Sequence, residues 1–188
     1  MEKANVQRCN WVNPHNPTYV HYHDEEWGVP VHEDHLLGEL LFLELLHSGL
    51  SWECVLMKRE ALRQALDNFA MERIAQYDAT KIEELLANPR IIRHRRKLEA
   101  LVVNAQVFLR IQQEWGSFAA YLWHWTSGQI IHETGLTHSP LSAVLTQDLK
   151  ARGMKYVGSV TLYAYLQAVG VISAHEAGCF LAAEEPHT

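Results

Sequence analysis

The sequence predicts an all-α protein. From about residue 35 onward, apolar residues recur at intervals of three and four, which is the period of an amphipathic helix. Residues that favour helix N-termini precede several of these stretches, and glycine or proline follows several of them. The alternation of apolar and polar residues that marks a half-buried strand is nearly absent, although residues 129–132 fit one short strand.

Four helices are predicted in the first half of the chain, and three of them start at a side chain that can accept hydrogen bonds from free backbone N–H groups. The helices cover residues 34–49 with Asp34 as the cap, 51–66 with Ser51, 78–87 with Asp78 or Thr80, and 92–114. The Asn88–Pro89 pair ends the third helix, because proline disfavours helical geometry in the residue before it.

Four more helices are predicted in the second half. They cover residues 117–125, 139–151 with Ser139 as the cap and Pro140 in the first turn, 158–169, and a last one starting near Ser173. Residues 127–138 are expected to be irregular. The first 35 residues are rich in histidine, asparagine, proline and aromatic residues without clear periodicity, so we expect them to be mostly irregular and held by something other than an apolar face.

Composition limits the class of protein. With 188 residues, 48% apolar and 20% charged, the chain is long enough for one domain or two small lobes and has an ordinary globular balance. No apolar run is long enough to cross a bilayer and no secretory leader is visible, so we expect no membrane partner. Three cysteines are an odd number, which favours a reducing, intracellular compartment.

A metal site is one interpretation of the cysteines and histidines. His175 and Cys179 are four residues apart, and on a helix this spacing places both side chains on one face. A tetrahedral structural zinc site needs two more ligands, and Cys9 and His23 lie in the N-terminal segment that needs an anchor. His15 and His21 compete for the fourth position. Buried thiols with surface histidines are the alternative.

Aromatic residues gather in the sequence around the N-terminal segment and the turn after the first predicted helix. They are Trp11, Tyr19, Tyr22, Trp27 and Trp52. Flat side chains with a polar tip suit stacking on a planar ligand such as a nucleobase, and they suit the core of a small lobe equally well.

Glu44 stands inside an apolar run, residues 40–46. The default interpretation is a position on the solvent-facing side of the helix. A carboxylate buried in a cleft would instead be able to bind a cationic group or stabilise developing positive charge.

Two segments could contact phosphate. Residues 152–158 carry Gly153 and Gly158 between two predicted helices, and free N–H groups of such a turn can hold a phosphate at a helix N-terminus. Residues 90–97 contain five basic side chains, which form either a solvated helix face or a local basic stripe. The net charge of −6 argues against a surface coated with positive charge but leaves room for such a stripe.

Longer motifs join these pieces. They are Tyr22-His23-Asp24-Glu25-Glu26-Trp27-Gly28-Val29-Pro30, Ser48-Gly49-Leu50-Ser51-Trp52, Lys155-Tyr156-Val157-Gly158 and His175-x-x-Gly178-Cys179. Together they resemble the 3-methyladenine DNA glycosylase I (Tag) family of bacterial base-excision repair enzymes. The resemblance runs from about Cys9 to Cys179, which is nearly the whole chain.

The resemblance implies a helix-hairpin-helix glycosylase bundle. It implies one glycosylase domain over residues 1–188, with a helical core at about 35–170 and terminal segments 1–34 and 171–188 pinned together by zinc. The implied activity is the flipping and hydrolytic release of 3-methyladenine from alkylated double-stranded DNA, which leaves an abasic site without strand cleavage. A cytoplasmic, nucleoid-associated monomer is expected.

The resemblance also assigns site residues by matching position. The zinc ligands would be Cys9, His23, His175 and Cys179. The base pocket would contain Trp11, Tyr19, Tyr22 and Trp52, with Glu44 as the carboxylate that favours a cationic base. Leu50 would plug the gap left in the DNA, and Lys155 and Gly158 would contact the DNA backbone, with Lys155 as a phosphate contact rather than a nucleophile.

The sequence departs from the family pattern directly after Glu44. Leu45 and Leu46 replace a small residue and a glutamine, and His47 stands where glutamine is expected. These changes raise the alternative of a narrower pocket, a different lesion, or a catalytically silent relative that binds damaged DNA. A zinc-stabilised interaction module without nucleic acid is a third hypothesis, which the acidic net charge favours.

Overall fold

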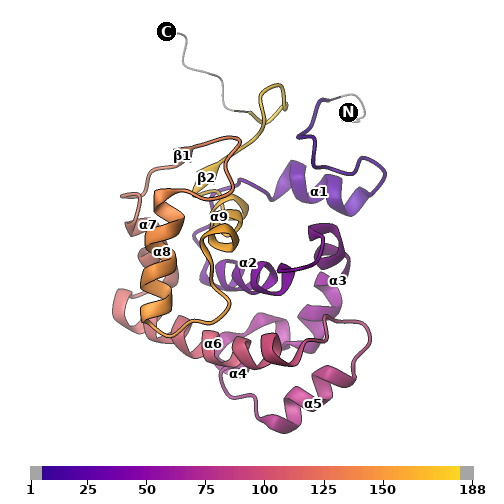
Figure 1. Ribbon diagram of the computed structural model, residues 1–188, viewed down its shortest axis with the longest axis vertical. Coiled ribbons are helices and arrows are strands. Elements are labelled where there is room, and N and C mark those ends of the chain that lie inside the picture. The colour runs from indigo at the N-terminus through magenta and orange to yellow at the C-terminus, as the bar shows by residue number, and fades with distance from the viewer. Residues whose placement is uncertain (1–5, 183–188) are drawn as a thin grey trace.

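The computed structural model describes residues 6–182, and most of them lie in helices (Figure 1). The helices are α1 (Pro17–Glu25), α2 (Asp34–His47), α3 (Trp52–Ala65), α4 (Met71–Ile74), α5 (Ala79–Ala87), α6 (Arg95–Trp115), α7 (Phe118–His124), α8 (Pro140–Ala151) and α9 (Ser159–Ala168). A 3-10 turn, η1 (Asp67–Phe69), and two short strands, β1 (Ile131–His132) and β2 (Ile172–Ser173), complete the described elements. The predicted helical class is confirmed.

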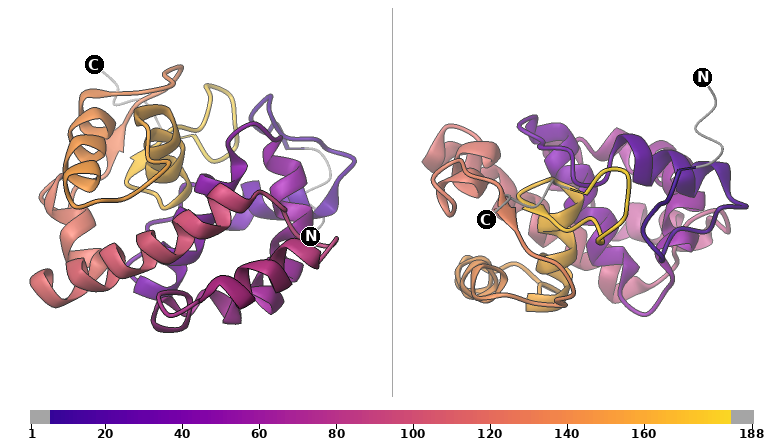
Figure 2. Two further views of the ribbon diagram at one scale, coloured as in Figure 1. Left: turned by 60° about the horizontal axis from the view of Figure 1, so that its bottom comes forward. Right: turned by 90° about the horizontal axis from the view of Figure 1, so that it is seen from above.

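Helix α2 lies at the centre and packs against α3, α6, α7 and α9, as Figures 1 and 2 show from three directions. Residues 37–46 are all buried, so this helix is enclosed on every side. The central position buries two carboxylates, Glu39 and Glu44. Glu39 is paired with Arg59 at 2.5 Å and Arg63 at 2.8 Å from the neighbouring α3.

Three predicted helix caps are confirmed. The Ser51 side chain accepts a hydrogen bond from the backbone N–H of Cys54, and Asp78 accepts one from Lys81. Ser139 forms a reciprocal capping box with Ser142 at the start of α8. These contacts lie within three residues of the cap, which is why the sequence reveals them.

The predicted role of Asp34 was wrong. Helix α2 has Glu33 at its N-cap, and Asp34 is its first helical residue. The Asp34 carboxylate accepts hydrogen bonds from the backbone N–H groups of Phe118 and Ala119, each at 2.8 Å. Those groups belong to the first turn of α7, so packing between distant helices redirects Asp34 from its own helix to a neighbour.

Both chain ends differ from the prediction. The N-terminal segment contains α1, whose cap Asn16 accepts hydrogen bonds from the Thr18 and Tyr19 N–H groups. No helix starts near Ser173. That residue lies in β2, which pairs in parallel with β1, and the Val171 and Ser173 carbonyls accept hydrogen bonds from Ile131 and Glu133. Hydrogen bonds from β1 thus satisfy backbone carbonyls of a segment that we expected to be helical from the sequence.

The two end segments are joined to each other and to the helical core. The Val31 N–H donates to the Val169 carbonyl at 3.0 Å, and the Phe180 N–H donates to Gln7 at 2.9 Å. Gly170 has φ of +72°, and a Cβ there would lie 2.4 Å from the backbone nitrogen of Pro30. Buried apolar residues form one cluster that reaches from Cys9 to Cys179. In the described part of the chain, no helix combines the length and apolar character needed to span a membrane.

Candidate active site and metal centre

Four predicted metal ligands meet between the two end segments. The ligand atoms of Cys9, His23, His175 and Cys179 all lie within 4.8 Å of one another. The Cys179 sulfur is 3.5 Å from Nε2 of His23 and 3.6 Å from Nδ1 of His175, and the Cys9 sulfur is 3.7 Å from the same Nδ1. His175 and Cys179 meet through a turn rather than a helix, so the predicted grouping is confirmed although its helical reason was wrong.

The donor set fits a tetrahedral zinc ion. Zinc bonds of about 2.0–2.3 Å separate neighbouring ligand atoms by about 3.3–3.8 Å, which includes the distances between sulfur and nitrogen atoms above. Burial raises the pKa of the Cys9 thiol to about 12, so a bound cation is needed to hold it as a thiolate. Burial, together with the nearby His23, lowers the pKa of His175 and favours the neutral imidazole that metals bind.

A second set of contacts orients these ligands. Asp24 Oδ1 lies 2.8 Å from Nδ1 of His23, which leaves Nε2 of the ring facing the cluster. The Arg8 guanidinium donates two hydrogen bonds to the Asp24 carboxylate, at 2.8 and 2.7 Å. A carboxylate behind a histidine ligand is a common feature of zinc sites. Gly28 leaves room for His175, since a Cβ at this position would lie 3.0 Å from its Nε2.

Next to the cluster lies a cavity of about 200 Å³. Helices α1, α2, α3 and α9 and the residues next to α1 form its walls. The lining residues are Trp11, Tyr19, Tyr22, Trp27, Glu44, His47, Trp52, Ala164 and Gln167. The four aromatic residues predicted for a base pocket therefore line one cavity. Burial raises the pKa of Tyr19 and of Tyr22, so both phenols stay neutral at pH 7.

The metal cluster supports one wall of this cavity. The Trp11 ring lies edge-on to His23 with centroids 5.3 Å apart, and Trp27 lies edge-on to His175 at 4.7 Å. Trp11 and Trp27 also contact each other at 4.9 Å. Two cavity aromatics thus pack directly on two histidines of the candidate metal cluster, so the cluster forms the backing of this wall.

Glu44 is the acidic group of the cavity and is only 4% exposed. Burial raises the pKa of its carboxyl group, and the His47 contact lowers it in part. Its Oε2 atom lies 3.3 Å from Nδ1 of His47, which is three residues along the same helix. A buried carboxylate surrounded by aromatic rings offers a site for a flat, positively charged group.

Only one of the three sequence departures lines this cavity. His47 does so, with its ring edge-on to Trp52 at a centroid distance of 5.4 Å. Leu45 and Leu46 lie on the other side of α2, against Leu101 and Asn104 of α6. Leu45 therefore gives no support to the alternative of a narrower pocket, because one step along a helix turns a side chain by about 100°.

Leu50 lies in the turn between α2 and α3 and is 39% exposed. Lys97 stabilises this turn. Its ammonium donates hydrogen bonds to the Leu46 carbonyl, at 2.9 Å, and to the Ser48 carbonyl. Lys97 is buried, so it is not a free member of the predicted basic stripe.

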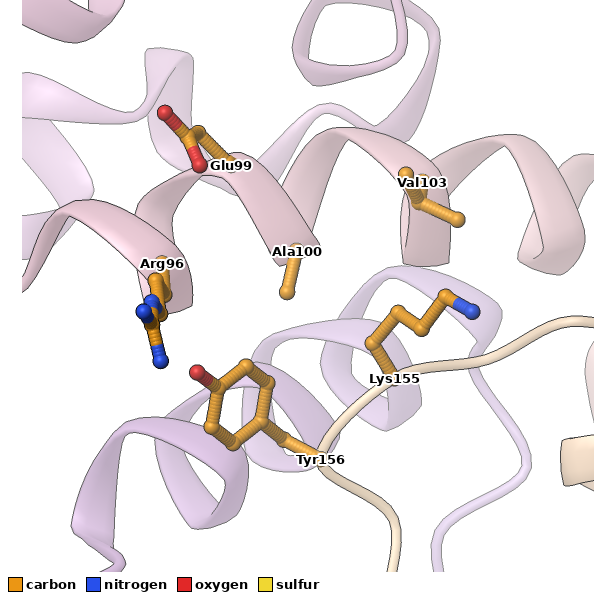
Figure 3. Close-up of a pocket in the computed structure, with 6 residues that line it drawn as sticks. All are labelled: Arg96, Glu99, Ala100, Val103, Lys155 and Tyr156. Carbon is orange, nitrogen blue, oxygen red and sulfur yellow. The ribbon is translucent and has the colours of Figure 1, made fainter.

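The segment between α8 and α9 places Lys155 and Tyr156 beside α6. The Asn104 side chain accepts a hydrogen bond from the backbone N–H of Lys155 at 2.7 Å and donates one to its carbonyl at 3.0 Å. Figure 3 shows Tyr156 directed toward Arg96, with Lys155 beneath Val103, around a groove of about 350 Å³. Gly158 is the N-cap of α9 and supplies no side-chain acceptor, which leaves the first N–H groups of that helix for another partner.

The basic residues near the groove differ in their pairing. Arg95 lies 2.7 Å from Glu83 and 3.8 Å from Glu99. Between residues 6 and 182, no ion pair involves Arg93 or Arg96. Among residues 6–182, Arg96 and Lys155 are the two cations of the groove and neither forms an ion pair, although Glu99 also lines the groove.

The family model of methyladenine glycosylases matches residues 11–182. The chain belongs to the methyladenine glycosylase family. It is 36% identical to DNA-3-methyladenine glycosylase 1 of Escherichia coli (strain K12) over 180 residues, covering 93% of this chain and 96% of that protein.

Solved structures of the family agree with this membership. A crystal structure of a 3-methyladenine DNA glycosylase I is 40% identical with a TM-score of 0.90, covering 94% of this chain and 100% of that one. The Staphylococcus aureus 3-methyladenine DNA glycosylase I, whose structure concerns recognition of 3-methyladenine, is 36% identical with a TM-score of 0.84 and covers 93% and 94% of the two chains. The family resemblance in the sequence is confirmed.

Some cavity residues were not predicted from the sequence as members of the pocket. Ala164 and Gln167 belong to α9, more than a hundred residues after the other walls, and carry no local signal of their own. Trp27 belongs to the group of aromatic residues noted in the sequence, but the resemblance assigned it no role in the base pocket. His47 was noted as a departure, but its contact with Glu44 depends on α2 remaining helical to its last residue.

Proposed function

We propose that this protein is a DNA glycosylase that releases 3-methyladenine from alkylated DNA. Family membership and the similarity to enzymes named for this base support the proposal. The observation that carries it is the position of Glu44, a carboxylate buried in a cavity lined by aromatic rings. A pocket that binds an uncharged base would gain nothing from a buried carboxylate, because burying a charge costs free energy.

Glu44 and the aromatic walls suit the chemistry of this lesion. An N3-methylated adenine in DNA carries a positive charge, which already weakens its bond to the sugar. The enzyme extrudes the nucleotide, stacks the base among Trp11, Tyr19, Tyr22 and Trp52, and places its charge near Glu44. Unmodified adenine is neutral and gains less from the carboxylate, so recognition and selectivity have one source.

The reaction is a hydrolysis. The bond between the sugar C1′ and the base N9 breaks, and its electron pair goes to the base, which leaves as neutral 3-methyladenine. A water oxygen bonds to C1′ and releases a proton to solvent, which gives an abasic site. Lys155 is assigned to phosphate rather than to C1′, so the proposed enzyme is monofunctional and does not cleave the strand.

The proposed DNA contacts come from two features. The turn that carries Leu50 is placed to fill the gap left by the extruded base. The segment of residues 152–158, flanked by α8 and α9, acts as a helix-hairpin-helix element, with Lys155 and the free N–H groups after Gly158 on the phosphates. Double-stranded DNA is the proposed partner, and one chain supplies every residue named, so we propose a monomer.

The four-residue cluster holds a structural zinc ion in this proposal. Cys9, His23, His175 and Cys179 leave no open coordination position, so the ion would supply stability and no chemistry. Residues 1–188 would then form one glycosylase domain, with segments 1–34 and 171–188 joined through the metal to the core at about 35–170. Action on bacterial chromosomal DNA places the enzyme in the cytoplasm, at the nucleoid.

The test is base release from duplex DNA treated with a methylating agent, with freed bases separated by chromatography. We expect 3-methyladenine without strand breaks from the unmodified protein. In Glu44→Gln we expect release to fall by about 100-fold or more while DNA binding is kept. DNA binding without any base release by zinc-loaded, folded protein would favour the silent relative instead.

A further inference from the structure

His47 is the only hydrogen-bond partner of Glu44 among residues 6–182. The His47 side chain is 33% exposed and that of Glu44 is 5% exposed, so solvent reaches the ring more readily than the carboxylate. Contact with Trp52 fixes the other side of the ring. His47 is therefore a partly exposed group in direct contact with the buried charge of the pocket.

The charged surroundings of His47 are few. Helix α1 contributes the neutral phenols of Tyr19 and Tyr22, and α9 contributes the uncharged Ala164 and Gln167. The ammonium of Lys97 from α6 is bound to the Leu46 and Ser48 carbonyls next to His47 in the chain. Among the cavity-lining residues, Glu44 carries the one carboxyl group and His47 the one imidazole.

We propose that His47 is a positioning residue that holds Glu44 for a cationic base and makes this preference depend on pH. The inference rests on the proposed function. A neutral His47 donates its Nδ1–H to one oxygen of Glu44 and leaves the other oxygen for the ligand. A protonated His47 cancels the negative charge of Glu44 and repels a cation at the entrance of the cavity.

The direction of the pH effect follows from counting protons. In the wild type, the first proton taken up can reside on the imidazole or on the carboxylate. In His47→Gln it can reside only on the carboxylate, while the amide still donates a hydrogen bond. The pair therefore loses its net negative charge at a higher pH than the lone carboxylate does. Imidazole and carboxyl groups ordinarily differ by about 2 units in pKa, and burial of Glu44 makes the difference between the two proteins smaller than this.

The experiment measures binding rather than catalysis. The probe is 3,9-dimethyladeninium, a fixed cation at every pH used, and the signal is fluorescence from the tryptophans of the cavity. We expect wild-type affinity to fall about tenfold at one pH unit below its midpoint, where His47→Gln keeps a clearly larger share of its affinity at pH 8. His138→Gln, which removes an exposed histidine outside the cavity, should follow the wild type.

A second variant tests positioning separately. His47→Leu has no donor, so at pH 8 we expect it to bind the cation about fivefold more weakly than His47→Gln does. Coincident pH profiles of wild type and His47→Gln, or equal affinity of the two variants at pH 8, would overturn the inference. Binding that follows His47 without base release from methylated DNA would reject the glycosylase function and keep the role of His47.

Discussion

At the scale of single residues, Glu44 is a position where stability and the proposed activity oppose each other. Burial raises its pKa, which means that the folded protein disfavours the charged form relative to the unfolded chain. The contact with His47 removes part of this disadvantage. A side chain that weakens the fold yet faces a cavity is a common property of binding and catalytic sites.

The pH dependence of stability should report this opposition. Burial raises the pKa of Glu44 in the folded protein above its value in the unfolded chain. Ionised Glu44 therefore lowers the free energy of unfolding. This loss is absent below the unfolded pKa and complete above the folded pKa. We expect Glu44→Gln to melt at a higher temperature than the wild type at pH 8, with the difference vanishing near pH 4. Differential scanning calorimetry checks this, with Glu72→Gln at an exposed position of α4 as the control. A lower melting temperature for Glu44→Gln at pH 8 would contradict the assignment.

The sequence predicted individual residues where a motif fixes them locally. Trp11, Tyr19, Tyr22 and Trp52 line one cavity because α1 and the start of α3 bring nearby segments together. The default position of Glu44 on a solvent-facing side was wrong, because α2 is enclosed by helices from later in the chain. The apolar residues on all sides of α2 fit an enclosed helix, but they do not show which later helices cover Glu44.

At the scale of elements, the end of α2 depends on a single ammonium group from α6. Lys97 satisfies the Leu46 and Ser48 carbonyls, which have no helical partner at this terminus. Burial lowers the pKa of Lys97, and the two carbonyls keep its charge compatible with a buried position. The element that carries Glu44, His47 and the Leu50 turn is thus fixed at its C-terminal end.

Replacement of this residue should cost stability. Lys97→Met keeps the apolar stem but leaves two carbonyls without a donor, so we expect a loss of about 1–3 kcal/mol in the free energy of unfolding. Urea unfolding gives this value. Arg93→Met, at an exposed position without an ion pair in the described chain, should stay within about 0.5 kcal/mol of the wild type. Similar losses in both variants would show that the contact with α2 contributes nothing.

The groove between α6 and the α8–α9 segment should contribute to DNA affinity through charge. We expect Lys155→Ala or Arg96→Ala to weaken binding to all duplex sequences alike and to reduce the slope of log affinity against log salt by about 1. Arg95→Ala is the matched control, because Arg95 is already paired with Glu83. Fluorescence anisotropy across a salt series measures the slopes, and equal slopes for Lys155→Ala and the control would contradict this role.

Elements were predictable where their signals are local. Ser51, Asp78 and Ser139 act within three residues of themselves, and their helices were predicted. Helix α1 has no apolar stripe to reveal it, and β2 forms only because β1 lies beside it. Such long-range pairing cannot be read from a window of neighbouring residues.

At the scale of the whole molecule, the metal cluster joins two segments more than 150 residues apart. The prediction concerns its thiols. We expect Cys179→Ser to lose the bound equivalent of zinc and to melt at a lower temperature, since a metal present at a thousand times its Kd stabilises by about 4 kcal/mol. Cys54→Ser is the control, because Cys54 lies outside the cluster. Atomic absorption and thermal unfolding measure both effects, and full zinc content in Cys179→Ser would reject the ligand assignment.

The packing of Trp11 and Trp27 on His23 and His175 has a consequence for biosynthesis. During translation, the N-terminal aromatic residues leave the ribosome first, yet their backing is complete only when Cys179 has been made. A nascent or prematurely terminated chain therefore lacks a finished wall on this side of the cavity. Competence to take up a base would arrive only once residue 179 has been made, so products that stop before it would not compete with the folded protein for damaged DNA.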